Sequence, residues 1–282
     1  MSNKINLIYL LGAGRSGTTL LATLLNNHDD IETLGEMHQF IEYVDKDKDC
    51  SCGEKLTSCS TWNLSSDLMD SNIKDERLYC ENKESHKNIP SLIFNKKADK
   101  RYISIQEHIF SALSGNRKSK WYLDSSKYIA RYLLLKKSKK LNIKGIYMVR
   151  DPRGVINSFT KKVQTSKRPL SAILYYNMIN LFGEVVSRNN RNILKIKYED
   201  LVESPEQVLD EIYKHVFGSS KASVKMPEYF TMPHIVGGNR IKTKKRIHLS
   251  KDTDWQRNIP RARQIMYYYL CFPFTYINKY RV

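Results

Sequence analysis

The chain has 282 residues, with 47 Lys and Arg against 29 Asp and Glu, so its formal net charge is +18. This length can bury a substantial core, most simply as one domain, and the charge predicts an anionic partner such as a nucleotide, a nucleic acid or a membrane surface. No apolar run reaches the roughly 20 residues that a membrane-spanning helix needs. Residues 5–11 lead into a glycine-rich loop and do not resemble a signal peptide. We therefore expect a soluble, cytoplasmic protein.

The first predicted elements are a strand, a loop and a helix that together form an anion site. Leu7–Leu11 is a short apolar run typical of a buried parallel strand, and leucines recur at helical spacing from Leu20 to Leu25. The free N–H groups at the start of a helix bind anions. We therefore expect a phosphate or sulfate site in the loop between them. The loop combines glycines, hydroxyls and one arginine: Gly12, Gly14, Arg15, Ser16, Gly17, Thr18 and Thr19.

This loop matches two common nucleotide motifs only in part. It reads as a P-loop in which Thr18 replaces the lysine that NTPases place on the β- and γ-phosphates, which argues against a nucleotide kinase or ATPase. It also reads G-x-G-x-x-G, the dinucleotide fingerprint, but Arg15 is a cation where that fingerprint usually has a small residue. Three alternatives stay open: an NAD-binding oxidoreductase, a basic nucleic-acid-binding protein, and a loop whose glycines serve only packing.

The remaining chain alternates between predicted strands and helices, which indicates an α/β fold with a mainly parallel sheet flanked by helices. Residues 41–120 are polar and irregular with helical patches, and we expect this insertion to form a wall over the site. The predicted strands are 31–34, 121–123, 144–149 and 192–197, and the predicted helices are 129–135, 171–186, one that begins at Pro152 and one from Pro205 to about Val216.

Chemically useful side chains follow these strands, and ligands of parallel α/β sheets bind beyond the carboxyl ends of the strands. Arg150 follows one predicted strand and Ser158 lies eight residues later, which predicts a second anion site. A nucleotide with phosphates at both its 5′ and 3′ positions accounts for both sites, whereas a dinucleotide accounts only for the first. The other strand ends carry Glu36, Lys127 and Tyr198.

Two of these motifs resemble those of the sulfotransferases that use 3′-phosphoadenosine 5′-phosphosulfate (PAPS). GAGRSGTTLL resembles their 5′-phosphosulfate loop, and RDPRGVINSF resembles their 3′-phosphate motif. IKYEDLVESP resembles the strand and loop that follow, while GGNRIK and KDTDW resemble the flexible loop over the nucleotide. The resemblance covers residues 5–36 and 121–260. It is nearer to the tyrosylprotein and bacterial carbohydrate branches than to the aryl branch, which carries lysine where this chain has Arg15.

The resemblance implies a P-loop-NTPase-like sulfotransferase fold over residues 1–282, with the insertion at about 41–120 on the acceptor side. It implies PAPS as co-substrate, 3′-phosphoadenosine 5′-phosphate (PAP) as by-product, and no metal requirement. The residues implied at the 5′-phosphosulfate are Gly14, Arg15, Ser16, Gly17, Thr18 and Thr19. Those implied at the 3′-phosphate are Arg150 and Ser158, and those near the nucleotide are Tyr198, Gly238, Asn239 and Arg240.

The resemblance also implies the catalytic groups. Gly35-Glu36 resembles a Gly-Glu pair whose glutamate is the general base in tyrosylprotein sulfotransferases, although this chain has one more residue in the connection. Lys127 resembles the lysine that contacts the sulfate and the bridging oxygen. His38 is the rival base, because imidazole titrates near neutrality and other branches use histidine. We prefer Glu36.

The acceptor is predicted from local charge. Residues 29–54 hold nine acidic residues and two lysines in an otherwise basic chain. If these acids line the acceptor side, they favour a small neutral or cationic natural product, such as a saxitoxin-type guanidinium alkaloid, and disfavour sulfated glycans. A solvated acidic turn is the simpler interpretation. Carbohydrate or protein-tyrosine O-sulfation is the alternative function, and we expect neither a nucleic-acid nor a membrane partner.

Three of the five cysteines, Cys50, Cys52 and Cys59, lie within ten residues, and Cys80 follows. A C-x-C-G turn with a third and a fourth thiol suits zinc, but the spacing is not a standard C-x-x-C pair. Zinc, a disulfide and reduced thiols all stay open, as does the oligomeric state.

Overall fold

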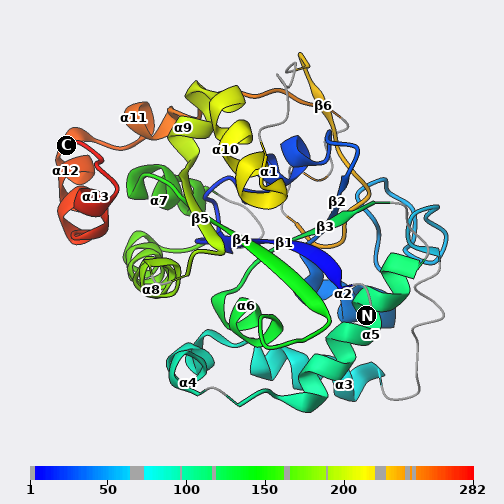
Figure 1. The fold of residues 1–282 in the computed structure, drawn as a ribbon. Helices are drawn as coiled ribbons and strands as arrows, with labels where there is room; N and C mark the ends of the chain where they lie inside the picture. The colour runs from blue at the N-terminus through cyan, green and yellow to red at the C-terminus, as the bar shows by residue number, and fades with distance from the viewer. Residues whose placement is uncertain are drawn as a thin grey trace. The chain divides into compact units, whose positions relative to one another are not determined.

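A sheet of five strands in the order β2-β3-β1-β4-β5 organises the fold (Figure 1). The pairs β1–β3 and β2–β3 are parallel. The predicted α/β class with a mainly parallel sheet is confirmed. The strands are β1 (Ile5–Gly12), β2 (Ile31–Gly35), β3 (Trp121–Lys127), β4 (Leu141–Val149) and β5 (Ile193–Lys197). The computed structural model describes residues 4–63, 73–95, 97–115, 119–161, 166–188, 190–219, 227–238, 242 and 246–282.

The strands form where the sequence supplies apolar runs that can be covered on both faces. Leu7–Leu11 in β1 is at most 1% exposed, as expected for a parallel strand inside a sheet. Leu7 is opposite Tyr122 of β3, and Trp121 is opposite Ile31 of β2. β3 is longer than predicted, since it continues through the buried polar residues 124–126 to Lys127.

The chain divides into two compact units, and β4 contributes residues to both. The first unit comprises Met1–Leu11, Thr19–Gly145 and Tyr229–Ile247. In it, α1 and α6 lie on opposite faces of the strands (Figure 1). A two-stranded antiparallel sheet pairs β6 (Phe230–Thr231) with β7 (Arg246–Ile247). The helices of this unit are α1 (Thr18–Leu25, which begins at the boundary), α2 (Phe40–Asp45), α3 (Ile73–Lys83), α4 (Ile89–Phe94), α5 (Lys100–Gly115) and α6 (Ile129–Leu135), with short 3₁₀ turns at Met37–Gln39 and His86–Asn88.

The predicted insertion, residues 41–120, is more regular than expected, because most of its described residues are helical. α5 is the clearest case. It buries Tyr102, Ile105, Ile109 and Leu113 at helical spacing. The exposed positions between them are the polar residues Ser104, His108 and Ser111. The many polar residues of this helix hid its apolar stripe in the sequence.

The second unit comprises Gly12–Thr18, Ile146–Glu228 and His248–Val282. Asp151 caps α7 by accepting a hydrogen bond from the Arg153 N–H at 2.8 Å, and Pro152 occupies the first turn, as predicted. The loop expected after β5 is instead a short helix, α9, which begins at Tyr198. The helices are α7 (Pro152–Thr160), α8 (Pro169–Arg188), α9 (Tyr198–Glu203), α10 (Pro205–Phe217), α11 (Asp254–Asn258), α12 (Arg261–Leu270) and α13 (Phe274–Ile277).

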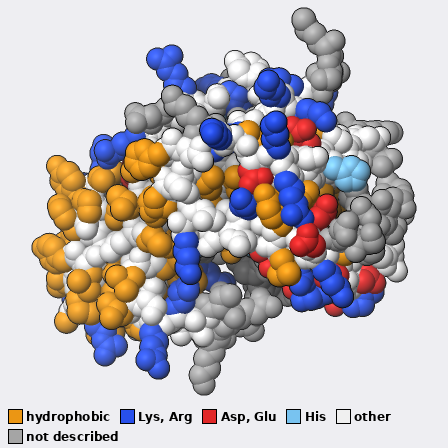
Figure 2. Space-filling model, turned by 90° about the horizontal axis from the view of Figure 1, so that it is seen from below, with side chains coloured by type: hydrophobic (Ala, Val, Ile, Leu, Met, Phe, Trp, Pro, Cys, Tyr) orange, Lys and Arg blue, Asp and Glu red, His pale blue; other side chains and the backbone are white. Residues whose placement is uncertain are grey.

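Exposed apolar side chains gather over α8, α12 and α13 of the second unit (Figure 2). In the part of the chain that the structure describes, no helix is both long and apolar enough to cross a membrane. The exposed apolar residues of this surface include Leu170, Leu174, Leu181, Tyr269, Leu270, Phe272 and Tyr276.

A buried ionic network joins β3, α6 and the insertion in the first unit. Arg131 is 1% exposed. Its Nε donates to Asp124 Oδ2 at 2.9 Å and its Nη1 to Glu84 Oε1 at 2.6 Å. Tyr102 of α5 donates to the same Glu84 oxygen at 2.6 Å. Burial raises the pKa of Glu84, and the charge of Arg131 opposes that shift. The network therefore depends on the guanidinium at its centre.

Replacing Arg131 with methionine is expected to lower the free energy of unfolding by about 3–5 kcal/mol, because it leaves two buried carboxylates without their cation. Urea unfolding followed by circular dichroism measures the loss. The control is Lys214→Met, which removes the exposed ion pair to Asp210 and should cost far less. Equal losses for the two variants would contradict a stabilising role for the network.

Candidate active site

The glycine-rich loop of the second unit has the geometry of an anion site. Arg15 has φ 70°, an unusual conformation for a residue with a side chain. Its guanidinium lies 5.6 Å from the ring centroid of Phe159. Gly17 has φ 94°, and a Cβ there would lie 2.6 Å from a ring carbon of Tyr198. Glycine is therefore required at this position, since both the turn and the packed tyrosine exclude a side chain.

One hydroxyl in this loop is buried without a partner. Ser16 is 1% exposed, and its Oγ has no hydrogen-bond partner in the described part of the chain. Thr18 and Thr19, at the start of α1, are also buried. Buried polar groups are normally satisfied, so an unpartnered hydroxyl beside a helix N-terminus fits an anionic oxygen of a bound phosphate or sulfate. The residues present therefore suit the group that the sequence predicted.

Arg150 lies in the same unit and is held on three sides. Its Nη1 donates to the carbonyl oxygen of Arg15 at 3.0 Å, and its Nη2 donates to Asp252 Oδ2 at 2.9 Å. The guanidinium also lies 4.2 Å from the ring centroid of Tyr198. The second unit thus brings together three predicted nucleotide residues, Arg15, Arg150 and Tyr198. Ser158 lies on α7 and is half-buried.

Asp252 is a residue that the sequence analysis did not single out, although it belongs to the KDTDW motif. Burial alone would raise the pKa of Asp252, but the hydrogen bond and charge of Arg150 outweigh burial and hold that pKa below its usual value. The backbone N–H of Asp252 donates to the Tyr198 hydroxyl at 3.2 Å. The Asp252 carboxylate therefore pairs with the Arg150 guanidinium, as the oxygens of a phosphate could.

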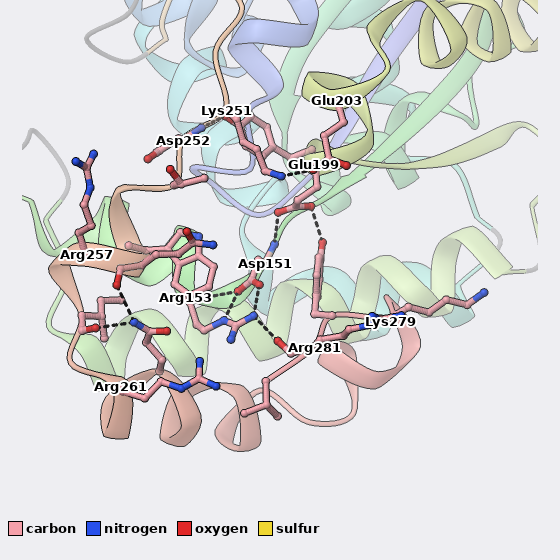
Figure 3. Close-up of a pocket in the computed structure, with 18 of the residues that line it drawn as sticks. Asp151, Arg153, Glu199, Glu203, Lys251, Asp252, Arg257, Arg261, Lys279 and Arg281 are labelled. Atoms are coloured by element: carbon pink, nitrogen blue, oxygen red, sulfur yellow. Dashed lines mark hydrogen bonds and ion pairs between the residues drawn. The ribbon is translucent and has the colours of Figure 1, made fainter.

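A polar cavity of about 1060 Å³ lies in the second unit, and Tyr198 and Asp252 are among its lining residues (Figure 3). Arg153 crosses it, donating to Asp151 Oδ2 and to the carbonyl oxygen of Arg281, both at 2.6 Å. Arg153 therefore ties α7 to the C-terminal residues.

The first unit brings together Glu36 and Lys127, the two predicted catalytic residues. The Lys127 ammonium donates to a Glu36 carboxylate oxygen, and the two side chains are 14% and 11% exposed. Gly35 has φ 91°, and a Cβ there would lie 2.2 Å from the Val236 carbonyl oxygen. The Glu36 N–H donates to that same oxygen at 2.8 Å. The close approach of Val236 therefore explains why glycine precedes this glutamate.

His38, the rival base, is buried beside them. Burial, followed by the positive charges of Lys127 and Arg131, lowers the pKa of His38 to about 3. Its ring lies 4.3 Å from that of Tyr128, and its Nδ1 has no hydrogen-bond partner among the described residues. These surroundings disfavour the protonated form of the His38 imidazole. The choice of Glu36 over His38 as the base stays a prediction.

Two predicted nucleotide residues, Asn239 and Arg240, lie outside the described residues. Gly238 is described and has φ 89°.

The acids of residues 29–54, predicted to line the acceptor side, are largely compensated by cations of the same unit. The ion pairs join Glu42 to Lys46 and Lys48, Asp45 to Arg77, and Asp49 to Lys55.

Comparison with known proteins identifies the class. The model of the sulfotransferase family matches residues 8–217, well over half of the chain. The chain therefore belongs to the sulfotransferase family, and the protein is an enzyme that transfers a sulfuryl group. No curated protein matches the sequence significantly.

The solved structures that match the chain are distant from it in sequence. The sulfotransferase domain of the Synechococcus PCC 7002 olefin synthase is 20% identical, with 78% of this chain and 76% of that chain covered and a TM-score of 0.47. The sulfotransferase domain from the curacin biosynthetic pathway is 20% identical with the same coverage and a TM-score of 0.49. Mouse sulfotransferase SULT7A1 complexed with PAP is 12% identical, with 99% and 86% covered and a TM-score of 0.48.

The depressed pKa of His38 predicts acid sensitivity of the fold. Below pH 6.5 the unfolded chain protonates this histidine, whereas the folded protein does not until about pH 3. The free energy of unfolding therefore falls by about 1.4 kcal/mol per pH unit as the pH is lowered through this window. Between pH 6.5 and 5, wild type should lose about 2 kcal/mol more unfolding free energy than His38→Gln.

Urea unfolding at several pH values measures this difference. The control is His108→Gln, because His108 is exposed on α5 and its loss should leave the pH dependence of wild type intact. Parallel stability curves for wild type and His38→Gln would show that His38 titrates normally in the folded protein.

Proposed function

We propose that this sulfotransferase takes its sulfuryl group from PAPS and transfers it to a hydroxyl or amine of a small acceptor. The observation that carries the proposal is the buried, unpartnered Ser16 hydroxyl in a loop that shares its unit with Arg15 and Arg150. A nucleotide with a 5′-phosphosulfate and a 3′-phosphate has two anionic groups that such a pair of cationic positions can bind.

In this proposal the loop binds the 5′-phosphosulfate. The N–H groups at the start of α1, together with Arg15 and the hydroxyls of Ser16, Thr18 and Thr19, offer donors to its oxygens. The Gly14 N–H contributes less, since it already donates to the Tyr175 hydroxyl at 2.9 Å. Arg150 and Ser158 bind the 3′-phosphate, which replaces Asp252 as the anionic partner of Arg150.

Glu36 and Lys127 carry the chemical step in this proposal. The acceptor oxygen or nitrogen forms a bond to sulfur while the bond from sulfur to the 5′-phosphate oxygen breaks, and PAP leaves. Glu36 takes the proton from the acceptor. Lys127 stabilises negative charge on the sulfuryl and bridging oxygens. The ion pair between the two side chains holds both in place until the reactants arrive.

The acceptor class is proposed from local charge. A cationic acceptor such as a saxitoxin-type alkaloid is the narrower version of the proposal, and it depends on the acids of residues 29–54. Because Glu42, Asp45 and Asp49 are paired within the chain, carbohydrate and tyrosine hydroxyls fit this surface as well. An acceptor screen therefore has to include all three classes.

Arg150→Met is expected to weaken PAP binding about 10- to 100-fold, the effect of losing a charge-assisted contact to phosphate. Adenosine 5′-phosphosulfate, which lacks the 3′-phosphate, should bind wild type and variant about equally. Calorimetric titration measures both affinities, with exposed Arg263→Met as the matched control. Equal weakening of both nucleotides would mean that Arg150 does not contact the 3′-phosphate.

Glu36→Gln should lower the rate of sulfuryl transfer by about 10²- to 10⁴-fold, the usual contribution of a general base, with PAP affinity unchanged. Transfer from ³⁵S-labelled PAPS to a panel of alkaloids, carbohydrates and tyrosine peptides measures it. Exposed Glu206→Gln is the control. If Glu36→Gln retains the wild-type rate with an accepted substrate, the assigned base is wrong.

A further inference from the structure

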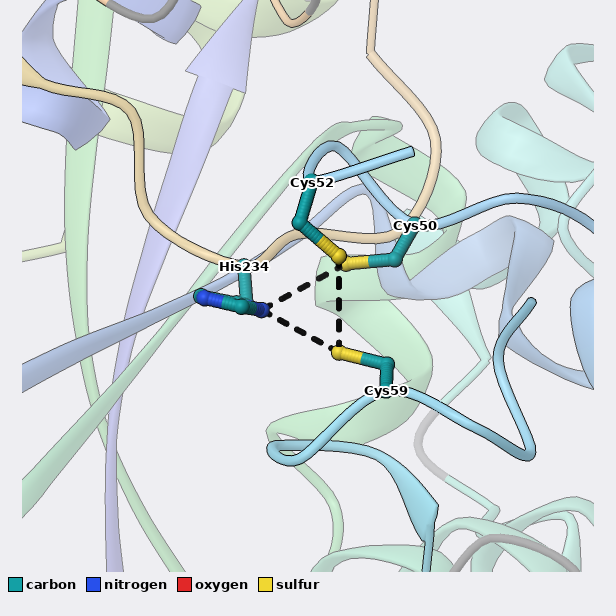
Figure 4. Close-up of side chains that lie close together, drawn as sticks. All are labelled: Cys50, Cys52, Cys59 and His234. Carbon is teal, nitrogen blue, oxygen red and sulfur yellow. Dashed lines mark hydrogen bonds between the residues drawn. The ribbon is translucent and has the colours of Figure 1, made fainter. Parts of the chain in front are cut away.

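Four potential metal ligands converge in the first unit, away from the proposed catalytic pair in sequence. The ligand atoms of Cys50, Cys52, Cys59 and His234 all lie within 4.8 Å of one another. Figure 4 shows the three thiols and the imidazole turned toward one point. The Cys59 Sγ lies 3.1 Å from His234 Nδ1, and the Cys52 and Cys59 sulfurs are 3.8 Å apart.

These distances suit a tetrahedral zinc ion. Zn–S bonds of about 2.3 Å place two sulfur ligands about 3.8 Å apart, which is the separation of Cys52 and Cys59. A disulfide would require about 2.05 Å between sulfurs, and it would leave the third thiol and the imidazole unexplained. Three cysteines and one histidine are a common ligand set for structural zinc.

We propose that Cys50, Cys52, Cys59 and His234 bind one structural zinc ion. Binding displaces the protons of the three thiols to solvent and takes the lone pair of His234 Nδ1, so no oxidation or reduction occurs. Four protein ligands leave no open position for substrate. The site is therefore separate from the transfer chemistry, and zinc binding does not depend on the proposed function.

The local backbone is already arranged for such a site. The C-x-C-G turn closes through hydrogen bonds from the Cys50 N–H to the Glu54 carbonyl at 2.8 Å and from the Gly53 N–H to the Cys50 carbonyl at 3.0 Å. This turn allows two cysteines separated by one residue to direct both sulfurs at the same point, despite a spacing shorter than in common zinc motifs.

Two residues of the same segment hold the backbone around His234. Ser51 lies between the thiols, and its Oγ donates to the Pro233 carbonyl at 2.6 Å and accepts from the Ile235 N–H at 2.9 Å. Trp62 Nε1 donates to the His234 carbonyl at 3.1 Å. The imidazole is thus fixed toward the cysteines by contacts on both sides of its residue.

The proposed zinc ion fastens a segment that reaches Glu36. Directly after His234 and Ile235, Val236 donates to the Leu34 carbonyl at 3.1 Å and accepts from the Glu36 N–H. The zinc site therefore anchors the short stretch of chain that holds Gly35 and Glu36 in place. Only this consequence for catalysis rests on the proposed role of Glu36.

Metal analysis of the full chain, purified without a histidine tag, tests the site. Wild type, incubated with zinc and dialysed, should contain one zinc ion per chain by mass spectrometry. Cys52→Ser and His234→Gln should lose at least about 90% of that zinc. Cys52 is exposed, so Cys52→Ser is the variant expected to keep its fold. Cobalt in place of zinc should give thiolate-to-metal absorption in wild type and not in Cys52→Ser or His234→Gln.

Cys80→Ser is the matched control, because Cys80 is buried elsewhere and its sulfur accepts from Gln106 Nε2 at 3.6 Å. It should bind zinc as wild type does. A folded wild type without zinc, a Cys52–Cys59 disulfide in its place, or equal zinc in Cys52→Ser would overturn the proposal. PAP titration of the same samples separates the zinc proposal from the proposed function. The zinc content tests the metal site whether or not PAP binds.

Discussion

Asp124 is the constraint on which the first unit depends. Its carboxylate is fully buried, and a buried charge is tolerated only where it is paired and hydrogen-bonded. One oxygen accepts from Arg131 Nε, and the other accepts from the backbone N–H groups of Met37 and Ser126. The residues on either side of these contacts include Glu36 and Lys127. A single buried carboxylate thus sets the position of both proposed catalytic groups.

The second unit also buries a charged side chain, in this case the cation of Arg150. Arg150 is only 6% exposed, and its guanidinium is held by a backbone carbonyl, an aromatic face and the carboxylate of Asp252. A cation arranged in this way loses little conformational freedom when an anion replaces Asp252. Ser16 is also fixed and buried, and its hydroxyl is available to a ligand oxygen. Both groups favour an anionic ligand over a neutral one.

The sequence predicted what depends on local pattern. Apolar runs and helical spacing located β1, α1, α6 and β4, and the rule that strand ends meet at one sheet edge anticipated that Glu36 and Lys127 lie together. The extent of β3 was missed, because residues 124–126 are polar yet buried. The apolar stripe of helix α5 was hidden by the polar residues between its buried positions.

Other features depend on contacts between distant parts of the chain, which a single sequence does not reveal. His234 joins cysteines that precede it by more than 170 residues, and Val236 reaches Gly35 across a similar separation. Asp252 became visible only as the partner of Arg150. The acids of residues 29–54 suggested a negative surface, in part because some of their partners, such as Arg77, lie outside that stretch.

The most direct test of the account is calorimetric titration of the wild-type protein with PAP, ATP and NAD, first without added magnesium. The account predicts that PAP binds clearly more tightly than the other two, because only PAP carries phosphates at both its 5′ and 3′ positions. Absence of PAP binding, or a preference for NAD or for ATP once magnesium is added, would contradict the two anion sites and the roles assigned around them.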